Sequence, residues 1–431
     1  MLVEFSVENY LSFKNRVTLS LVAATRDKSL SNNTFKVEGL PSDMSLLRSV
    51  IIYGANASGK SNLIKALSFM KSFVINSASE KQEEEHIPVV PFKLDLASTK
   101  QPSRFEIIFM LDGQRHIYGF SVDEGKIQEE RLEVESRELF HRIGDEVEFG
   151  RSWRGDRKRL SLLMHNKMLV LSLAARQKNK IAEGILDWFK TRIKAISDSP
   201  EIQSEMRFTI ELLEKEKISE EFFNRYIKVA DLGFEKVKIK NVPLSKADLQ
   251  KKMESASDRN TKAILTDILS SLPEGSEVRL VEAKSRHKAK DGYEAEFEFQ
   301  EESAGTNRYI ALLGPWIYAA KSGCVLLVDE LDSHMHPLMT QMLVRLINEA
   351  GQQHPQLIFT THDCSLLDSG LFRRDQVWFT EKNKENATDL YSLWDYKIPG
   401  VRKDGNYRIG YLKGKYGAIP FIGDLDFAKK G

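Results

Sequence analysis

Cysteine is nearly absent from this chain of 431 residues, which contains only Cys324 and Cys364. Two cysteines cannot form a disulfide framework, and they fit buried thiols in a reducing cytoplasm. No charge of one sign dominates, because 63 Lys and Arg residues against 62 Asp and Glu residues leave a net charge of +1. This balance excludes a generally basic nucleic-acid coat. Long apolar runs are missing too, since the uncharged stretch 309–320 is shorter than the roughly 18 residues of a membrane-spanning helix.

The N-terminus also lacks the basic and apolar segments of a signal peptide, so we expect a soluble, cytoplasmic protein with no membrane partner. Hydrophobic residues make up 41% of the chain, which is enough for a sizeable core. The length allows two or three domains.

The first part of the chain has the pattern of strands with one glycine loop. Residues 1–25 alternate apolar and polar side chains, which predicts two half-buried strands around a turn at residues 8–10. The apolar run 50–53 predicts a buried strand, followed by the loop and an amphipathic helix. Further on, turn signals separate three short strands of an antiparallel β-subdomain, at residues 105–111, 116–122 and 132–135.

Charged helical segments are expected next, at residues 182–196, 204–217, 220–229 and 247–272. Strands then alternate with helices, with strands at 278–283, 293–300, 324–328, 357–360 and 376–380 and helices at 307–321 and 337–350. This alternation predicts an α/β fold whose parallel sheet is covered by helices on both faces. We expect this α/β domain to be split in sequence, with its N-terminal half at residues 1–168, an α-helical insertion at 169–275 and its C-terminal half at 276–431.

Residues 54–61 read Gly-Ala-Asn-Ala-Ser-Gly-Lys-Ser between the predicted strand and helix. This pattern in this context predicts a phosphate-binding loop, whose backbone amides and helix N-terminus hold an anion. Lys60 would reach the β- and γ-phosphates, and Ser61 would hold Mg²⁺. The predicted nucleotide-binding residues of this loop are Gly54, Asn56, Ser58, Gly59, Lys60 and Ser61.

A second set of candidate residues follows the strand at 324–328, which ends in Asp329 and Glu330. Ligands of open α/β sheets bind at the carboxyl ends of the strands. Asp329 would hold Mg²⁺, and Glu330 would orient or deprotonate the attacking water. The next strand ends in Thr-Thr-His-Asp, which places His362 where it can reach the γ-phosphate.

A turn of small residues at 301–308 opens a predicted helix and presents Ser303 and backbone amides to an anion. Taken alone, this turn fits an ordinary helix N-cap equally well. His334 and His336, next to Asp332, suggest a metal site, but no third partner stands at a suitable spacing and this interpretation is disfavoured.

In this order, the motifs resemble those of ABC-type ATPases of the SMC-like and OLD-like kind. More closely, they resemble the stand-alone bacterial anti-phage defence ATPases of the RloA/AbiL type. The resemblance extends over nearly the whole chain and is specific in residues 1–65 and 300–420. The segments that carry it, besides the glycine loop and the Asp-Glu pair, are residues 7–13, 302–306, 373–378 and 411–420.

The resemblance implies an AAA-family enzyme that hydrolyses ATP with Mg²⁺ and forms a homodimer or a higher homo-oligomer. In that dimer, Ser303 and Gly305 of one subunit would contact the γ-phosphate held by the loop of the other. Hydrolysis would need Glu330, and His362 would be the switch histidine. This sequence departs from the family pattern in two places. Glu302, Ala304 and Thr306 replace three positions of the usual Leu-Ser-Gly-Gly-Gln signature. Leu11 stands where relatives have an arginine, so Lys14 or Arg16 would have to take the role of that arginine.

OLD-like relatives carry a Toprim nuclease, and Asp424 and Asp426 superficially fit its Asp-x-Asp pair. Too little chain surrounds them for that fold, so we expect any nuclease to be a separate, Toprim-like effector protein. Nucleic acid could also touch the ATPase at two basic clusters. These are Arg151, Arg154, Arg157, Lys158 and Arg159 around Trp153, and Lys284, Arg286, His287, Lys288 and Lys290.

The leading hypothesis is therefore an ATP-dependent dimeric switch that senses an invader and controls a separate effector. The alternative is a DNA-repair type of ATPase that clamps nucleic acid without a dedicated effector. A GTPase is disfavoured, because residues 383–386 read Asn-Lys-Glu-Asn and lack the base-reading aspartate.

Overall fold

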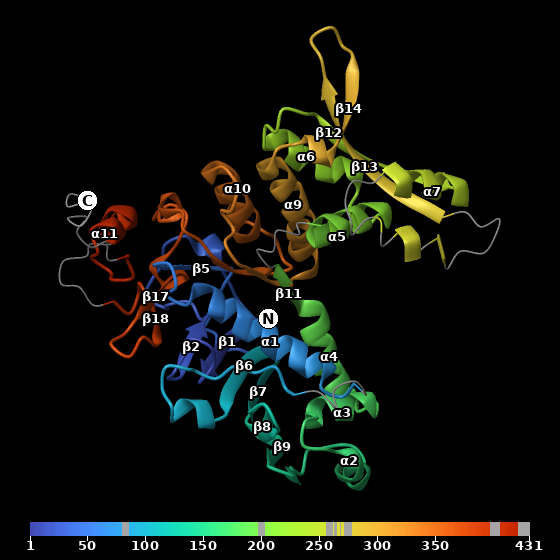
Figure 1. Cartoon of the computed structure of the whole chain (residues 1–431). Coiled ribbons are helices and arrows are strands. Elements are labelled where there is room, and N and C mark those ends of the chain that lie inside the picture. Colours follow the sequence, from blue (N-terminus) through green and yellow to red (C-terminus); the bar gives the residue numbers. More distant parts are fainter. Residues whose placement is uncertain are drawn as a thin grey trace, which may run out of the picture. The chain divides into compact units, whose positions relative to one another are not determined.

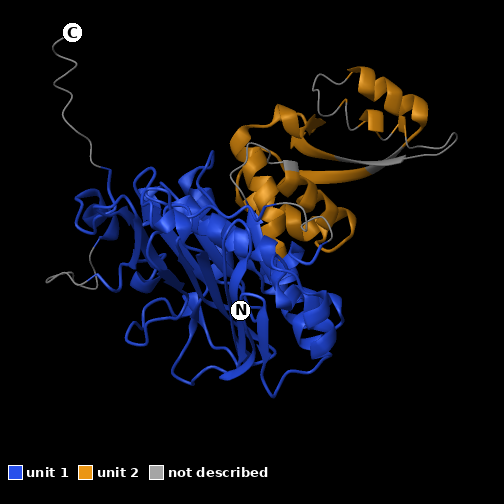
Figure 2. Cartoon of the chain, turned by 60° about the horizontal axis from the view of Figure 1, so that its bottom comes forward, with its two compact units in different colours: residues 1–199, 319–431 blue, residues 200–318 orange. Residues whose placement is uncertain are grey.

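The computed structural model describes residues 1–79, 86–196, 203–255, 262, 265–267, 269–270, 278–396 and 406–420. The chain divides into two compact units, shown in different colours in Figure 2. Unit 1 comprises Met1–Ser199 and Ala319–Gly431, and unit 2 comprises Pro200–Tyr318. Each unit is described below by itself.

The larger unit contains a six-stranded sheet within the described residues, in the order β11-β15-β16-β5-β17-β18 (Figure 1). Neighbouring strands are parallel from β11 to β17, and β18 closes the edge antiparallel to β17. The strands are β5 (Ser49–Gly54), β11 (Ile193–Ile196), β15 (Val325–Val328), β16 (Gln356–Thr360), β17 (Val377–Lys382) and β18 (Thr388–Ser392). All side chains of β5, β15 and β16 are buried, as expected for central strands of a parallel sheet.

An antiparallel sheet of seven described strands forms the rest of this unit, in the order β10-β9-β8-β7-β6-β1-β2. These strands are β1 (Leu2–Glu8), β2 (Val17–Ser20), β6 (Ser103–Leu111), β7 (Gln114–Val122), β8 (Ile127–Val134), β9 (Arg137–Ile143) and β10 (Glu146–Phe149). The predicted N-terminal strand pair and β-subdomain are thus confirmed, with β9 and β10 in addition. A small pair, β3 (Thr34–Phe35) and β4 (Leu46–Leu47), lies between β2 and β5 in sequence.

The helices of this unit are α1 (Lys60–Asn76), α2 (Arg157–Leu163), α3 (Val170–Arg176), α4 (Lys180–Arg192), α10 (Pro337–Asn348) and α11 (Tyr407–Leu412). One core cluster joins buried side chains of α1 to both sheets, for example Leu67 of α1 with Val50 of β5 and Phe105 of β6. This shared core fixes the start of α1, and therefore the glycine loop, against the parallel sheet.

Unit 2 is not wholly helical. It contains α5 (Gln203–Glu214), α6 (Glu220–Val229) and α7 (Lys246–Ser255), together with most of α9 (Ala304–Ser322). It also contains an antiparallel sheet in the order β12-β13-β14, made of Lys236–Leu244, Val278–Lys288 and Glu294–Glu298. Strand β12 was not expected from the sequence.

The expected helix at residues 182–196 is wrong in its last four residues, which form β11. Ile193 aligns with Val325 and Ile196 with Val328, so parallel pairing with β15 outweighs the helical pattern. This return to the main sheet places α3 and α4 in unit 1, whereas the expected insertion began at residue 169. The second compact unit accordingly spans 200–318 instead of 169–275.

The α/β fold with a mainly parallel sheet is as predicted. Among the described residues, every helix falls short of the length or apolar character that a membrane span requires.

Candidate functional site

The glycine loop curls tightly between β5 and α1. Lys60 is 6% exposed, and its Nζ donates hydrogen bonds to the carbonyl oxygens of Gly54 at 2.8 Å and Ala55 at 3.2 Å. Gly59 has a φ of 109°, and a Cβ there would lie 2.3 Å from Thr388 Oγ1. The loop therefore requires glycine at this position for both its backbone angle and its packing.

Three polar residues outside the predicted motif hold the loop in place. Ser58 Oγ lies 2.7 Å from Thr380 Oγ1, and Thr388 Oγ1 donates to Ser58 O at 2.7 Å. Thr388 Oγ1 also lies 2.8 Å from Ser12 Oγ. Sequence reasoning did not single out these three residues, although Ser12 falls in the segment 7–13 that carries the resemblance. Asn56, at the tip of the loop, is exposed.

Asp329 lies beside the start of α1, because β15 and β5 run parallel with β16 between them. Ser61 Oγ donates to Asp329 Oδ1 at 3.0 Å. Thr360, at the end of β16, donates through Oγ1 to the same oxygen at 2.6 Å, and its Oγ1 accepts the backbone N–H of Glu330 at 2.8 Å. Thr360 thus orients both acidic residues, a role that the sequence analysis did not assign to it.

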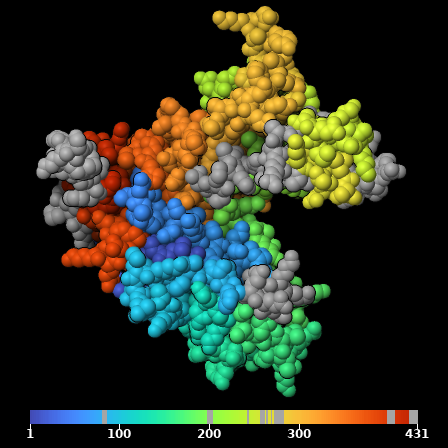
Figure 3. Space-filling view, in the orientation of Figure 1, coloured from blue at the N-terminus to red at the C-terminus, as the bar shows by residue number. Residues whose placement is uncertain are grey.

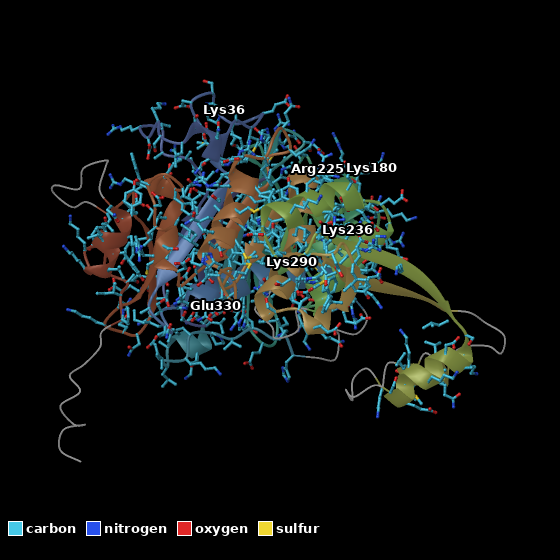
Figure 4. The ribbon with its side chains drawn as sticks, turned by 90° about the horizontal axis from the view of Figure 1, so that it is seen from above. Lys36, Lys180, Arg225, Lys236, Lys290 and Glu330 are labelled. Carbon is cyan, nitrogen blue, oxygen red and sulfur yellow. The ribbon has the colours of Figure 1, made fainter. Side chains whose placement is uncertain are left out.

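Glu330, labelled in Figure 4, lies just beyond the end of β15 with a φ of 47°. Its Oε1 is 3.9 Å from Nε2 of His362, and both side chains are partly exposed, at 40% and 43%. The backbone N–H of His362 donates to Asp332 Oδ2 at 3.3 Å. The structure therefore brings Glu330 and His362 together, as their positions after neighbouring strands predicted.

Burial dominates the electrostatics of the two basic groups here. Burial lowers the pKa of Lys60, although the nearby Glu330, Asp329 and Asp332 oppose this shift. Burial also lowers the pKa of His362, and the positive charge of Lys60 lowers it further against the opposing effect of Asp332 and Asp329. A proton on this imidazole is therefore disfavoured while Lys60 carries its charge.

The predicted anion-binding turn lies in unit 2. Ser303 is exposed and precedes α9, and its Oγ accepts the backbone N–H of Thr306 at 3.1 Å. Glu302 is mostly buried, with Oε1 2.7 Å from His287 Nε2 and hydrogen-bonded to Ser285 Oγ. Glu302, which departs from the usual signature, thus links β13 to the start of α9. Gly305 lies in the first turn of that helix.

The residues considered for other roles have local partners. Lys14 Nζ is 2.8 Å from Glu385 Oε1, and an Arg16 guanidinium nitrogen is 2.5 Å from Glu106 Oε1. His336 caps α10 by accepting the N–H of Leu338 at 3.3 Å through Nδ1. Within the described residues, no group of three or more His, Cys, Asp or Glu side chains could hold a metal ion alone.

The two basic clusters differ. In the cluster at 284–290, Lys284 pairs with Glu298 at 2.8 Å and Arg286 with Glu296 at 3.1 Å, both across β13 and β14. In the cluster at 151–159, the described part of the chain gives no ion pair to a basic side chain, and Arg157 donates instead to the carbonyl of Gly150 at 2.9 Å. Asp424 and Asp426 lie outside the described residues.

Three comparisons with known proteins bear on the identity of this chain. The family model described as "AAA domain, putative AbiEii toxin, Type IV TA system" matches residues 49–368. The SMC head domain from Thermotoga maritima is a similar solved structure, with 13% identity, a TM-score of 0.43 and coverage of 92% of this chain and 99% of that one. An SMC head bound to the C-terminal winged-helix domain of ScpA has 11% identity, a TM-score of 0.45 and coverage of 91% and 97%. A sequence comparison with curated proteins finds no match.

Proposed function

The chain belongs to the AAA-domain family whose model spans residues 49–368, and from this premise we propose that it is an ATP-hydrolysing dimeric switch. More narrowly, we place it with the RloA/AbiL-type defence ATPases, where it controls a separate effector. The observation that carries the proposal is the convergence of Lys60, Ser61 and Asp329 at the carboxyl ends of parallel strands. The loop that carries Lys60 has no room for a side chain at Gly54 or Gly59.

The residues present fit ATP with Mg²⁺. Ser61 Oγ and Asp329 Oδ1 are 3.0 Å apart, so two oxygen ligands of the kind that Mg²⁺ prefers are already adjacent. The bound ion would neutralise charge on the phosphates. Lys60 would exchange its contacts with the Gly54 and Ala55 carbonyls for phosphate oxygens, which restores the solvation that its ammonium loses on burial.

Glu330 then orients the attacking water or accepts its proton. His362 helps to position the Glu330 carboxylate, whose Oε1 lies 3.9 Å from the Nε2 atom of His362. The backbone N–H of Glu330 is fixed on Thr360, so the carboxylate leaves β15 in a defined direction. Ser303 and Gly305 complete the site from a second subunit. Ser303 is exposed and Gly305 is partly exposed at the start of α9, which supports this role because a second subunit can reach both residues.

The dimer is therefore the state that ATP stabilises, and its opening after hydrolysis is the signal. A Toprim-like nuclease is the effector that the family resemblance suggests. This part of the proposal stands on the resemblance alone, and its test is separate from that of the ATPase.

The ATPase is tested with Glu330→Gln and Lys60→Ala, by measuring ATP binding, hydrolysis and molar mass in solution. We expect Glu330→Gln to bind ATP, to hydrolyse it on the order of 10²–10⁴-fold more slowly, and to accumulate dimers with ATP. Lys60→Ala should bind ATP about 100-fold or more weakly and remain a monomer at ATP concentrations that saturate the wild type. Equal loss of ATP binding in both variants would contradict these roles. The effector is tested by co-purification from the native host followed by mass measurement.

A second function, an ATPase that clamps nucleic acid without an effector, is favoured by the basic cluster at 151–159, which makes no ion pair with the residues that the structure describes. It predicts that DNA stimulates ATP hydrolysis and that neutralising this cluster removes the stimulation. Hydrolysis that DNA leaves unchanged would reject it in favour of the effector-controlling switch.

A further inference from the structure

A pocket of about 410 Å³ lies in unit 1, where residues 154–160 meet the end of α3 and the start of α4. Figure 3 shows the surface of this segment in green. A volume of this size falls within the range of small-ligand sites. Nothing in the nucleotide site described above involves these residues.

Four cations line this pocket: Arg154, Arg159, Lys178 and Lys180. All four side chains are exposed, and none is ion-paired within the described residues. Lys180, labelled in Figure 4, is the first residue of α4. The pocket has a single acidic lining residue, Asp156, whose Oδ1 accepts the backbone N–H of Arg159 at 3.0 Å. A surplus of three positive charges therefore remains for an anionic ligand.

The walls of the pocket are held by specific contacts. Asn179 caps α4 by accepting the N–H groups of Ile181 and Ala182, each at 3.1 Å, and its Nδ2 donates to the carbonyl of Arg154. Trp153, 3% exposed, packs edge-on against Phe140 at a ring distance of 5.6 Å. Arg154 is thus tethered on both sides, so its guanidinium projects from a fixed backbone.

The floor is apolar. Leu160 and Ala174 are buried at 4% and 0% exposure, and Ile181 completes the surface. A ligand that fits must combine a flat, weakly polar body with negative charge at its edge. A nucleotide has this combination, and arginine side chains can also stack on a base. A base within a duplex is paired and stacked and cannot enter such a pocket.

We propose that this pocket binds a single-stranded nucleic acid, with one unpaired base on the apolar floor and the adjoining phosphates against Arg154, Arg159, Lys178 and Lys180. The cluster at 284–290 has no such role, because glutamates of β14 already neutralise its strand residues Lys284 and Arg286. The inference uses only residues of unit 1 outside the nucleotide site, so it does not depend on the proposed ATPase.

The test uses the full chain and a fluorescent oligothymidine of about 15 nucleotides, a length that covers a typical single-strand site. The test variant is Arg154→Glu with Arg159→Glu. The matched control is Lys93→Glu with Lys100→Glu, which changes the net charge equally at two exposed lysines outside the pocket. Binding is measured by anisotropy at several salt concentrations, and ATP hydrolysis is measured in parallel as a check of folding.

We expect the test variant to bind roughly tenfold or more weakly at physiological salt, with a salt dependence reduced by about 1.4 for two lost phosphate contacts. The control should bind like the wild type, and both variants should retain ATP hydrolysis. Equal weakening in both variants would reduce the effect to overall charge and overturn the proposal. Tighter binding of the matching duplex, or competition by thymidine monophosphate at the same concentration as the strand, would overturn the assignment to a single strand.

Discussion

The glycine loop of unit 1 and the Ser303 turn of unit 2 are both predicted to hold the same phosphate, yet they are built differently. On the loop side, Lys60 is buried and Ser61 is hydrogen-bonded to Asp329 across the sheet. On the turn side, Ser303 is exposed, and its side chain contacts Thr306 in the first turn of α9. One half is assembled within a single chain, and the other presents donors outward.

This difference indicates which half sets the affinity for ATP and which half controls hydrolysis. A preassembled cradle binds its ligand without further ordering, so the loop half should set the affinity of a lone subunit for ATP. An exposed turn contributes only when a second surface meets it. The turn should therefore control hydrolysis and dimer stability while leaving the first binding step unchanged.

The largest expected effect separates the two halves in dilute, monomeric protein. Lys60→Ala removes a buried ammonium from the cradle, and ATP binding should weaken about 100-fold or more. Ser303→Arg alters only the exposed turn, and ATP binding by monomers should match the wild type. Titration calorimetry measures both. Weak binding by Ser303→Arg would mean that the turn belongs to the same subunit's site, and the comparison would fail.

The next effect is restoration of activity by mixing. Each variant alone should be inactive, because Lys60→Ala subunits bind ATP too weakly to form ATP-bound dimers and Ser303→Arg dimers have a damaged turn at both sites. A mixed dimer pairs the intact loop of the Ser303→Arg subunit with the intact turn of the Lys60→Ala subunit. Random mixing in equal amounts should restore roughly a quarter of wild-type hydrolysis. Activity that stays at background would exclude a site shared between subunits.

The positions of the acidic residues could be predicted from the sequence because strand order decides them. Taken alone, an apolar run that ends in Asp329 and Glu330 fits a helix N-terminus equally well, and together with the glycine loop it predicts the carboxyl edge of a parallel sheet. The contacts that orient them could not be predicted in this way. Thr360 and Thr388 are common strand residues, and nothing in a single sequence distinguishes a hydroxyl that holds a catalytic loop from one that faces a neighbouring strand.

Longer-range pairing explains the remaining differences. Residues 193–196 extend an amphipathic helical pattern, and only the distant β15 converts them to a strand. Glu130 in β8 has the sequence context of an exposed acidic residue. It is fully buried instead, where it accepts the N–H groups of Val170 and Leu171 at 2.6 and 3.0 Å and thereby caps α3. Such tertiary partners are invisible to local periodicity.

Thr360→Val tests whether the loop half depends on the hydrogen bonds that orient its acidic residues. It keeps the side-chain shape but removes the hydrogen bond to Asp329 and leaves the N–H of Glu330 without its acceptor. Hydrolysis should slow about tenfold or more, because two buried hydrogen bonds that orient the acidic residues are lost together. Thr340→Val in α10 is the matched control, because that threonine is equally buried and its hydroxyl has no hydrogen-bond partner among the described residues. A similar loss of rate in both variants would reduce the effect to general destabilisation.

The smallest expected effect is a pH dependence at His362, whose side chain is 43% exposed. Burial and then the charge of Lys60 lower its pKa below 6.5, while Asp332 and Asp329 oppose the shift. As the pH falls from neutral, the unfolded chain therefore takes up this proton before the folded protein does, so His362 lowers the free energy of unfolding below pH 6.5.

For kcat/KM, which reports the free enzyme, the lowered pKa of His362 predicts a plateau near neutral pH and a decline that begins below 6.5. His362→Gln cannot titrate and should be slower throughout without that decline, which also separates the effect from protonation of the nucleotide itself. An unchanged decline in His362→Gln would assign the pH dependence to another group and leave His362 without a role in the preassembled half.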